Sequence, residues 1–127
     1  MADKKLKILI VDDDQFLLDM YTLKFKEKGF DVVSAFGSVS ALNKLKDGQY
    51  FDIIITDIVM PAMDGFDLLE KIKKDKLAEN AKIIVLSNLG QPSDIEKGVS
   101  LGADGYIVKA KSTPSEMVEK VIEIYNK

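Results

Sequence analysis

The chain has 127 residues, 18 of them basic and 21 acidic, so its formal net charge is −3. This length suits one domain with one sizeable core, and the charge balance gives no electrostatic reason to expect nucleic acid as a partner. Cys and His are both absent, which excludes disulfides, thiolate and imidazole metal sites, and catalysis of the Ser-His-Asp or Cys-His kind.

The sequence also bears on membranes and targeting. No apolar run approaches the roughly 20 residues that span a bilayer. The opening MADKKLKILIVDDD turns acidic too early for a signal peptide. We therefore expect a cytoplasmic protein without membrane contact, with residues 1–127 forming a single domain. Chemistry would then fall to Asp, Glu, Lys, Ser, Thr or Tyr, with a hard, oxygen-binding cation as the candidate cofactor.

Five short apolar runs predict strands. They are nearly continuous rather than alternating, which is typical of strands covered on both faces, as in parallel sheets. In chain order they occupy residues 6–11, 32–33, 53–55, 83–86 and 107–108.

Apolar residues recur with helical spacing after each of these runs, which predicts five helices. Their apolar stripes run over residues 16–23, 41–45, 66–72, 95–99 and 117–125. We expect the buried face of the first helix to consist of Phe16, Leu17, Met20 and Leu23. Asp64 is the expected N-cap of the third helix, and residues 113–116, TPSE, form a capping box before the fifth.

The alternation predicts an α/β fold, (βα)₅. Because crossovers between parallel strands are right-handed, the helices should lie on both faces of an open, doubly wound, five-stranded parallel sheet. Ligands of such sheets bind beyond the C-terminal ends of the strands, near the switch in strand order.

Polar residues follow four of the five predicted strands. Asp12 and Asp13 come after the first, Asp57 after the third, Ser87 after the fourth and Lys109 after the fifth. Converging carboxylates repel one another, and a divalent cation such as Mg²⁺ would relieve that repulsion. With the charge of Lys109 and the hydroxyl of Ser87, this set could hold a phosphoryl group against a carboxylate nucleophile.

Asp14 completes the run of three acids but has a simpler explanation. It is expected to lie at the start of the first helix, whose positive end favours a carboxylate. We assign it no chemical role.

Four motifs carry a family resemblance. They are VDDD at 11–14, TDIVMPAMDG at 56–65, LSN at 86–88 and GADGYIVKA at 102–110. In this order they resemble the receiver domain of bacterial two-component response regulators, whose members have a CheY-like, flavodoxin-like fold. The resemblance covers nearly the whole chain.

The resemblance implies a chemistry for the acidic residues. Asp57 would accept a phosphoryl group from a histidine kinase or phosphotransfer protein, in an Mg²⁺-dependent reaction. Asp12, Asp13, Asp57 and the backbone carbonyl of Val59 would hold the Mg²⁺, and Lys109 would pair with a phosphoryl oxygen. Enzymatic activity would be limited to this self-phosphorylation and to autodephosphorylation.

The resemblance also implies a switch. Ser87 would turn toward the phosphoryl group and Tyr106 would change rotamer in response. A face made of the fourth helix, fifth strand and fifth helix would then meet an unknown downstream protein, with the receiver a monomer or a phosphorylation-dependent dimer. Pro61 and Gly65 would shape the loop after Asp57.

Three departures from the family pattern stand out. Ala110 takes the place of the usual Pro, so the bond after Lys109 is expected to be trans with a displaced loop, or cis under strain. Val59 and Leu89 are apolar where polar side chains help place the hydrolytic water, which predicts slow autodephosphorylation. Residues 111–113, KST, stand where the chemotaxis regulator has an aromatic residue, which predicts different partners.

Other functions stay open on the sequence. One alternative is a phosphorylation-independent interaction module, which Ala110 keeps alive. A second is an aspartate-dependent phosphatase, although Val59 stands where such an enzyme carries a second acid. A third is a receiver that belongs to a longer regulator. Flavin or nucleotide binding is disfavoured because no glycine-rich phosphate-binding motif is present.

Overall fold

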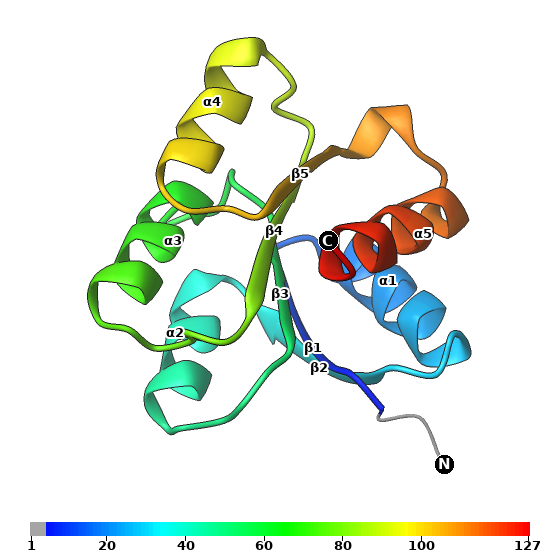
Figure 1. Ribbon diagram of the computed structural model, residues 1–127, viewed down its shortest axis with the longest axis horizontal. Helices are drawn as coiled ribbons and strands as arrows, with labels where there is room; N and C mark the ends of the chain where they lie inside the picture. Colours follow the sequence, from blue (N-terminus) through cyan, green and yellow to red (C-terminus); the bar gives the residue numbers. More distant parts are fainter. Residues whose placement is uncertain (1–4) are drawn as a thin grey trace.

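The computed structural model describes residues 5–127, in which strands and helices alternate along the chain (Figure 1). The strands are β1 (Lys7–Asp12), β2 (Asp31–Phe36), β3 (Ile53–Thr56), β4 (Lys82–Ser87) and β5 (Gly105–Val108). The helices are α1 (Gln15–Glu27), α2 (Ser38–Lys46), α3 (Gly65–Lys74), α4 (Pro92–Ser100) and α5 (Pro114–Tyr125). A short 3₁₀ turn, η1 (Lys109–Lys111), joins β5 to α5. The predicted (βα)₅ alternation is confirmed.

The five strands form one sheet in the order β2-β1-β3-β4-β5, with each neighbouring pair parallel. Val11 near the end of β1 pairs with Ala35 on β2 and with Thr56 on β3. Since β2 and β3 lie on opposite sides of β1, the strand order reverses there. The C-terminal ends of β1 and β3 therefore flank the switch point, where a doubly wound sheet binds its ligands.

Helices cover both faces of the sheet, with α1 and α5 on one side and α2, α3 and α4 on the other (Figure 1). Successive residues of a strand point to opposite faces. On β1, Ile8 and Ile10 join the core cluster that includes α1 and α5, whereas Leu9 and Val11 join the cluster that includes α2 and α3. Because both faces of the sheet are covered, the inner strands β1, β3 and β4 have nearly continuous runs of buried residues.

The buried face of α1 differs from the predicted one. Phe16 and Leu23 are 68% and 60% exposed, whereas Leu18, Tyr21 and Phe25 are buried. Both sets have helical spacing, so the periodicity indicates a helix without choosing between its faces. The sheet makes that choice, since the cluster of Leu18, Tyr21 and Phe25 packs against β1 and β3.

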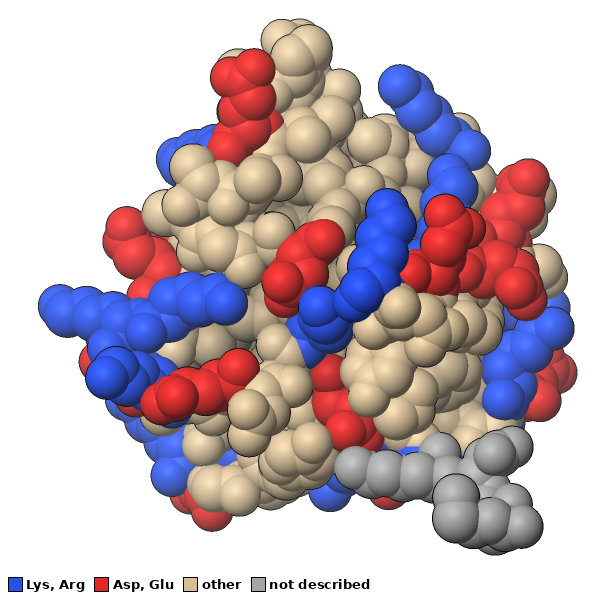
Figure 2. Space-filling model, in the orientation of Figure 1, with Lys and Arg blue, Asp and Glu red and all other residues tan. Residues whose placement is uncertain are grey.

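The surface of the described chain has two further properties. Among the helices of residues 5–127, none combines the length and the apolar character that crossing a membrane would need. Figure 2 shows basic and acidic side chains interspersed on the face that it draws, so this face carries no single sign of charge.

Candidate functional site

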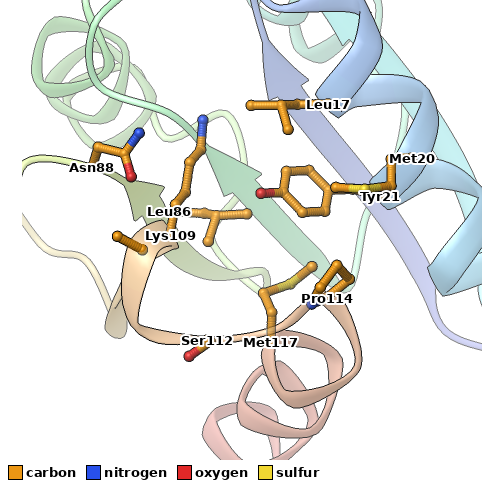
Figure 3. A pocket seen from close by; sticks show the side chains of 10 residues that line it. Leu17, Met20, Tyr21, Leu86, Asn88, Lys109, Ser112, Pro114 and Met117 are labelled. Atoms are coloured by element: carbon orange, nitrogen blue, oxygen red, sulfur yellow. The ribbon is translucent and has the colours of Figure 1, made fainter.

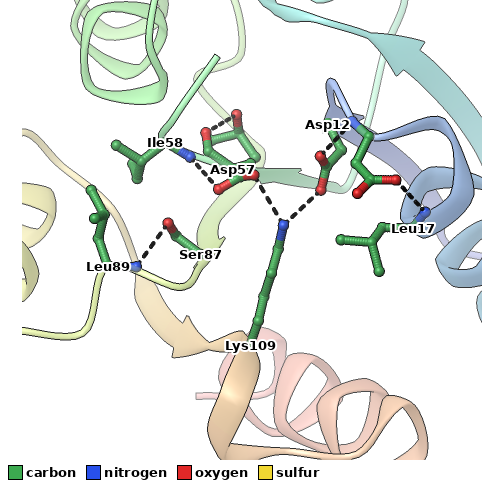
Figure 4. A network of polar contacts seen from close by, with 9 residues as sticks. Asp12, Leu17, Asp57, Ile58, Ser87, Leu89 and Lys109 are labelled. Atoms are coloured by element: carbon green, nitrogen blue, oxygen red, sulfur yellow. Dashed lines mark hydrogen bonds and ion pairs between the residues drawn. The ribbon is translucent and has the colours of Figure 1, made fainter.

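Asp12, Asp57 and Lys109 meet at the C-terminal edge of the sheet, although they come from the ends of three different strands (Figure 4). The Lys109 Nζ atom lies 2.9 Å from Asp12 Oδ2 and 2.9 Å from Asp57 Oδ2. The other oxygens are held by the backbone: Asp12 Oδ1 accepts the N–H of Asp14 at 3.0 Å, and Asp57 Oδ1 accepts that of Ile58 at 2.7 Å. Both carboxylates are therefore fixed in place.

Lys109 reaches this position with Ala110 after it. The Lys109–Ala110 peptide bond is trans, the first of the two outcomes considered from the sequence, and the chain continues directly into the turn η1. The missing proline therefore does not keep the ammonium group away from Asp57.

Burial and charge together set the proton affinities at this edge. Asp12 is 2% exposed, and burial raises the pKa of its carboxyl group, although the N–H of Asp14 and the ammonium of Lys109 oppose the rise. Burial lowers the pKa of Lys109, but its hydrogen bonds to Asp12 and Asp57 outweigh this effect, and the pKa lies above its ordinary value. Lys109 is thus held as a cation between the two carboxylates.

The side chains of Asp13 and Asp14 have different surroundings, as predicted. Oxygen atoms of Asp12, Asp13 and Asp57 all lie within 4.8 Å of one another. Asp14 instead caps α1, with its Oδ1 accepting the N–H of Leu17 at 3.1 Å. The helix-start role of Asp14 is confirmed, and Asp13 lies with the two buried carboxylates.

The cluster of Asp12, Asp13 and Asp57 could bind a metal ion. Its donors are all carboxylate oxygens, which suit a hard divalent cation, and its three negative charges face one ammonium group. The Oδ2 atoms of Asp12 and Asp57 already accept hydrogen bonds from Lys109. A cation would share these oxygens with the lysine or displace it from them.

Ser87 and Tyr106 are linked through the backbone of Leu89. The buried Ser87 Oγ accepts the N–H of Leu89 at 3.2 Å (Figure 4). The Tyr106 hydroxyl donates to the carbonyl oxygen of Leu89. Burial of the Tyr106 phenol raises its pKa, and nearby Asp94 and Asp57 raise it further. The two residues predicted to switch thus meet at one peptide segment.

The loop between Asp57 and α3 folds back over the end of β3. The Gly65 N–H donates to the Ile58 carbonyl at 2.8 Å, and the Met63 N–H donates to that of Pro61 at 2.8 Å. Val59 lies in this loop and is 62% exposed. The metal-binding role of the Val59 carbonyl stays a prediction.

A pocket of about 280 Å³ opens beside Lys109, between α1, the turn η1 and α5 (Figure 3). Tyr21 of α1 contributes its ring to this pocket, and its hydroxyl points toward Lys109 and Leu86. Burial raises the pKa of the Tyr21 phenol. Sequence reasoning missed Tyr21 because it was not assigned to the buried stripe of α1, although its spacing from Leu18 and Phe25 was the available signal.

Comparisons with known proteins match this architecture. Residues 8–122 match the family described as the response regulator receiver domain. The chain is 36% identical over 119 residues to "Probable transcriptional regulator ycf27" of Guillardia theta, covering 94% of this chain and 45% of the relative. It is 34% identical over 110 residues to "Gliding motility regulatory protein" of Myxococcus xanthus, covering 87% of this chain and 14% of the relative. The chain thus spans less than half the length of both relatives.

A solved structure gives the same result for the fold. The chemotaxis response regulator CheY4 of Vibrio cholerae superposes with a TM-score of 0.86 at 26% identity, covering 95% of this chain and 99% of that one. The strand order, the acidic cluster at the sheet edge and the family match over residues 8–122 all indicate the same kind of domain. The chain therefore belongs to the bacterial response regulator receiver family, which is consistent with phosphorylation-based signalling.

Proposed function

We propose that this chain receives a phosphoryl group on Asp57, from a histidine kinase or phosphotransfer protein, and thereby changes its affinity for a downstream protein. The observation that carries the proposal is the placement of the Lys109 ammonium 2.9 Å from both Asp12 and Asp57, beside Asp13. The same placement weighs against the phosphorylation-independent module that Ala110 leaves open, because Lys109 reaches Asp57 without a proline after it.

The reaction follows from the charges at the site. A carboxylate oxygen of Asp57 forms the new bond to phosphorus, and the bond from phosphorus to the donor's leaving group breaks, with the electron pair going to that group. Lys109 balances the negative charge on the transferred group, which is what phosphoryl transfer chiefly needs. Asp12, Asp13, Asp57 and the Val59 carbonyl would hold Mg²⁺, which when bound neutralises further phosphoryl charge.

Signalling would follow from the segment that joins Ser87, Leu89 and Tyr106. Once Asp57 carries the phosphoryl group, the Ser87 hydroxyl turns to donate to it, and Tyr106 readjusts. The face built from α4, β5 and α5 then presents a different surface to its partner, as a monomer or in a phosphorylation-dependent dimer. We place this exchange in the cytoplasm, and a longer regulator containing this receiver is compatible with it.

Treatment of the protein with acetyl phosphate tests the proposal. We expect a phosphoryl adduct, detected by intact mass, that requires Mg²⁺ and disappears in Asp57→Asn. Beryllofluoride should bind under the same conditions. Absence of any Mg²⁺-dependent adduct would favour an interaction module, and rapid turnover of external phosphate esters would favour a phosphatase.

The phosphorylated protein is expected to lose its phosphoryl group slowly, because Val59 and Leu89 cannot hydrogen-bond an attacking water. Val59→Asn and Leu89→Glu should each shorten the half-life about three- to tenfold, the rate effect of one ordinary hydrogen bond in the transition state. The measurement is the decay of the adduct after the phosphodonor is removed.

Leu23→Asn is the matched control for these two variants. Leu23, like Val59, is an exposed apolar residue, but it lies on α1, about two helical turns after Phe16. The phosphoryl adduct of Leu23→Asn should have the same half-life as that of the parent. If the parent already loses phosphate as fast as Val59→Asn and Leu89→Glu, the apolar side chains do not shield the phosphoryl group.

A further inference from the structure

The buried position of helix α4 is occupied by a glycine. Among the residues of α4, all of which the structure describes, only Gly98 is buried. Its neighbour Val99 is 55% exposed. Glycine weakens a helix relative to alanine because it loses more backbone freedom on folding. Helix formation therefore gives no reason for glycine at the one position where α4 is buried.

The surroundings of Gly98 give such a reason. A Cβ atom at this position would lie 3.1 Å from Cδ2 and 3.3 Å from Cε2 of the Tyr106 ring, and 3.8 Å from Cε1 of Phe66. The first two distances are shorter than ordinary carbon–carbon contacts. The Tyr106 ring thus lies so close to position 98 that a side chain there would require the ring to shift.

This position of Tyr106, with its ring on Gly98 and its hydroxyl bonded to the Leu89 carbonyl, is called the inward pose. Ser87 Oγ accepts the N–H of Leu89, so Ser87 and the Tyr106 phenol are bonded to the same residue. When Ser87 turns toward a phosphoryl group on Asp57, its contact with the Leu89 N–H changes, and with it the segment whose carbonyl holds the phenol. Phosphorylation and the inward pose therefore favour each other, and the coupling must act equally in both directions.

We propose that Gly98 is a positioning residue for the Tyr106 switch: the absence of a side chain at position 98 is what allows the phenol ring to lie inward against α4. The proposal deepens the proposed function and rests on it for the link to phosphorylation. A methyl group at position 98 would force the ring away from α4 by a few tenths of an ångström, strain the hydrogen bond to Leu89 and so disfavour the phosphorylated form.

Gly98→Ala tests this with two readouts. A fluorotyrosine placed at position 106 reports the ring directly, and its ¹⁹F resonance should move toward that of a solvent-exposed tyrosine before any phosphodonor is added. The affinity for beryllofluoride in the presence of Mg²⁺ should fall about fivefold or more. Val99→Ala, the exposed neighbour on the same helix, should change neither value.

The Tyr106→Ala background separates an effect on the ring from an effect on the helix. There, Gly98→Ala should leave the beryllofluoride affinity unchanged. An unaltered ¹⁹F resonance in Gly98→Ala would overturn the proposal, and so would an affinity loss of the same size in the Tyr106→Ala background. If the parent binds no beryllofluoride, the proposed function fails, whereas the ¹⁹F comparison still decides whether Gly98 positions the ring.

Discussion

Gly65→Ala is expected to lower the free energy of unfolding by about 3 kcal/mol, the upper end of what overpacking usually costs. An added Cβ would fall well inside contact distance of the Asp57 carbonyl oxygen and only 2.8 Å from Ile58 Cα. Both are backbone atoms, which cannot rotate away as a side chain would. The loop would have to open, and the hydrogen bond from the Gly65 N–H to the Ile58 carbonyl would be lost.

Gly105→Ala provides the control for Gly65→Ala. A Cβ at Gly105 would also make a close contact, 2.5 Å from Cδ1 of Ile124, but that atom is the end of a flexible side chain on α5. We expect a loss of less than about 1.5 kcal/mol, because the isoleucine can change rotamer. Urea unfolding measures both variants. Equal losses would show that the close approach at Gly65 is not what demands glycine there.

Gly65→Ala should also impair phosphorylation in the molecules that remain folded. The displaced atoms belong to the backbone of Asp57 and Ile58, and the Ile58 N–H holds Asp57 Oδ1 at 2.7 Å. A shift of this segment moves the proposed acceptor relative to Lys109. Acetyl phosphate labelling of the folded fraction, compared with that of Gly105→Ala, measures the effect.

The elements that the sequence predicts best are those with only one physical solution. A strand covered on both faces must be apolar throughout, so β1, β3 and β4 are recognised from their composition alone. Helix α1 is different because it carries two apolar stripes with the same period. Choosing Leu18, Tyr21 and Phe25 over Phe16 and Leu23 requires knowing where the sheet lies, which no local pattern contains.

The same distinction applies to the candidate site, part of which follows from local sequence and topology and part of which depends on tertiary packing. Asp12, Asp57 and Lys109 come together because parallel strands end at one edge, a consequence of topology that the sequence already implies. The inward pose of Tyr106 depends instead on a close approach between α4 and β5. In the sequence, Gly98 is only a glycine in a helical segment, and its importance becomes visible once the ring that lies against it is known.

Asp13→Asn is expected to weaken Mg²⁺ binding on the order of tenfold or more, whereas Asp14→Asn should leave it nearly unchanged. Oxygen atoms of Asp13 lie within 4.8 Å of those of Asp12 and Asp57, so Asp13 belongs to the donor set. Asp14 caps α1 through the N–H of Leu17, and asparagine is an equally good N-cap. Calorimetric titration with MgCl₂ measures both affinities, and equal losses would contradict this division of roles.

Adding Mg²⁺ should reverse the order of melting temperatures between Asp13→Asn and the parent. Without Mg²⁺, Asp13→Asn should melt at a higher temperature than the parent, because it removes one of three carboxylates that face a single ammonium group. With Mg²⁺ at about 100 times the parent's dissociation constant, the parent gains about 2.7 kcal/mol from binding, whereas a variant that binds tenfold more weakly gains only about 1.4 kcal/mol. Asp14→Asn should follow the parent in both conditions. A parent that melts above Asp13→Asn even without the cation would show that repulsion among these carboxylates is not what binding relieves.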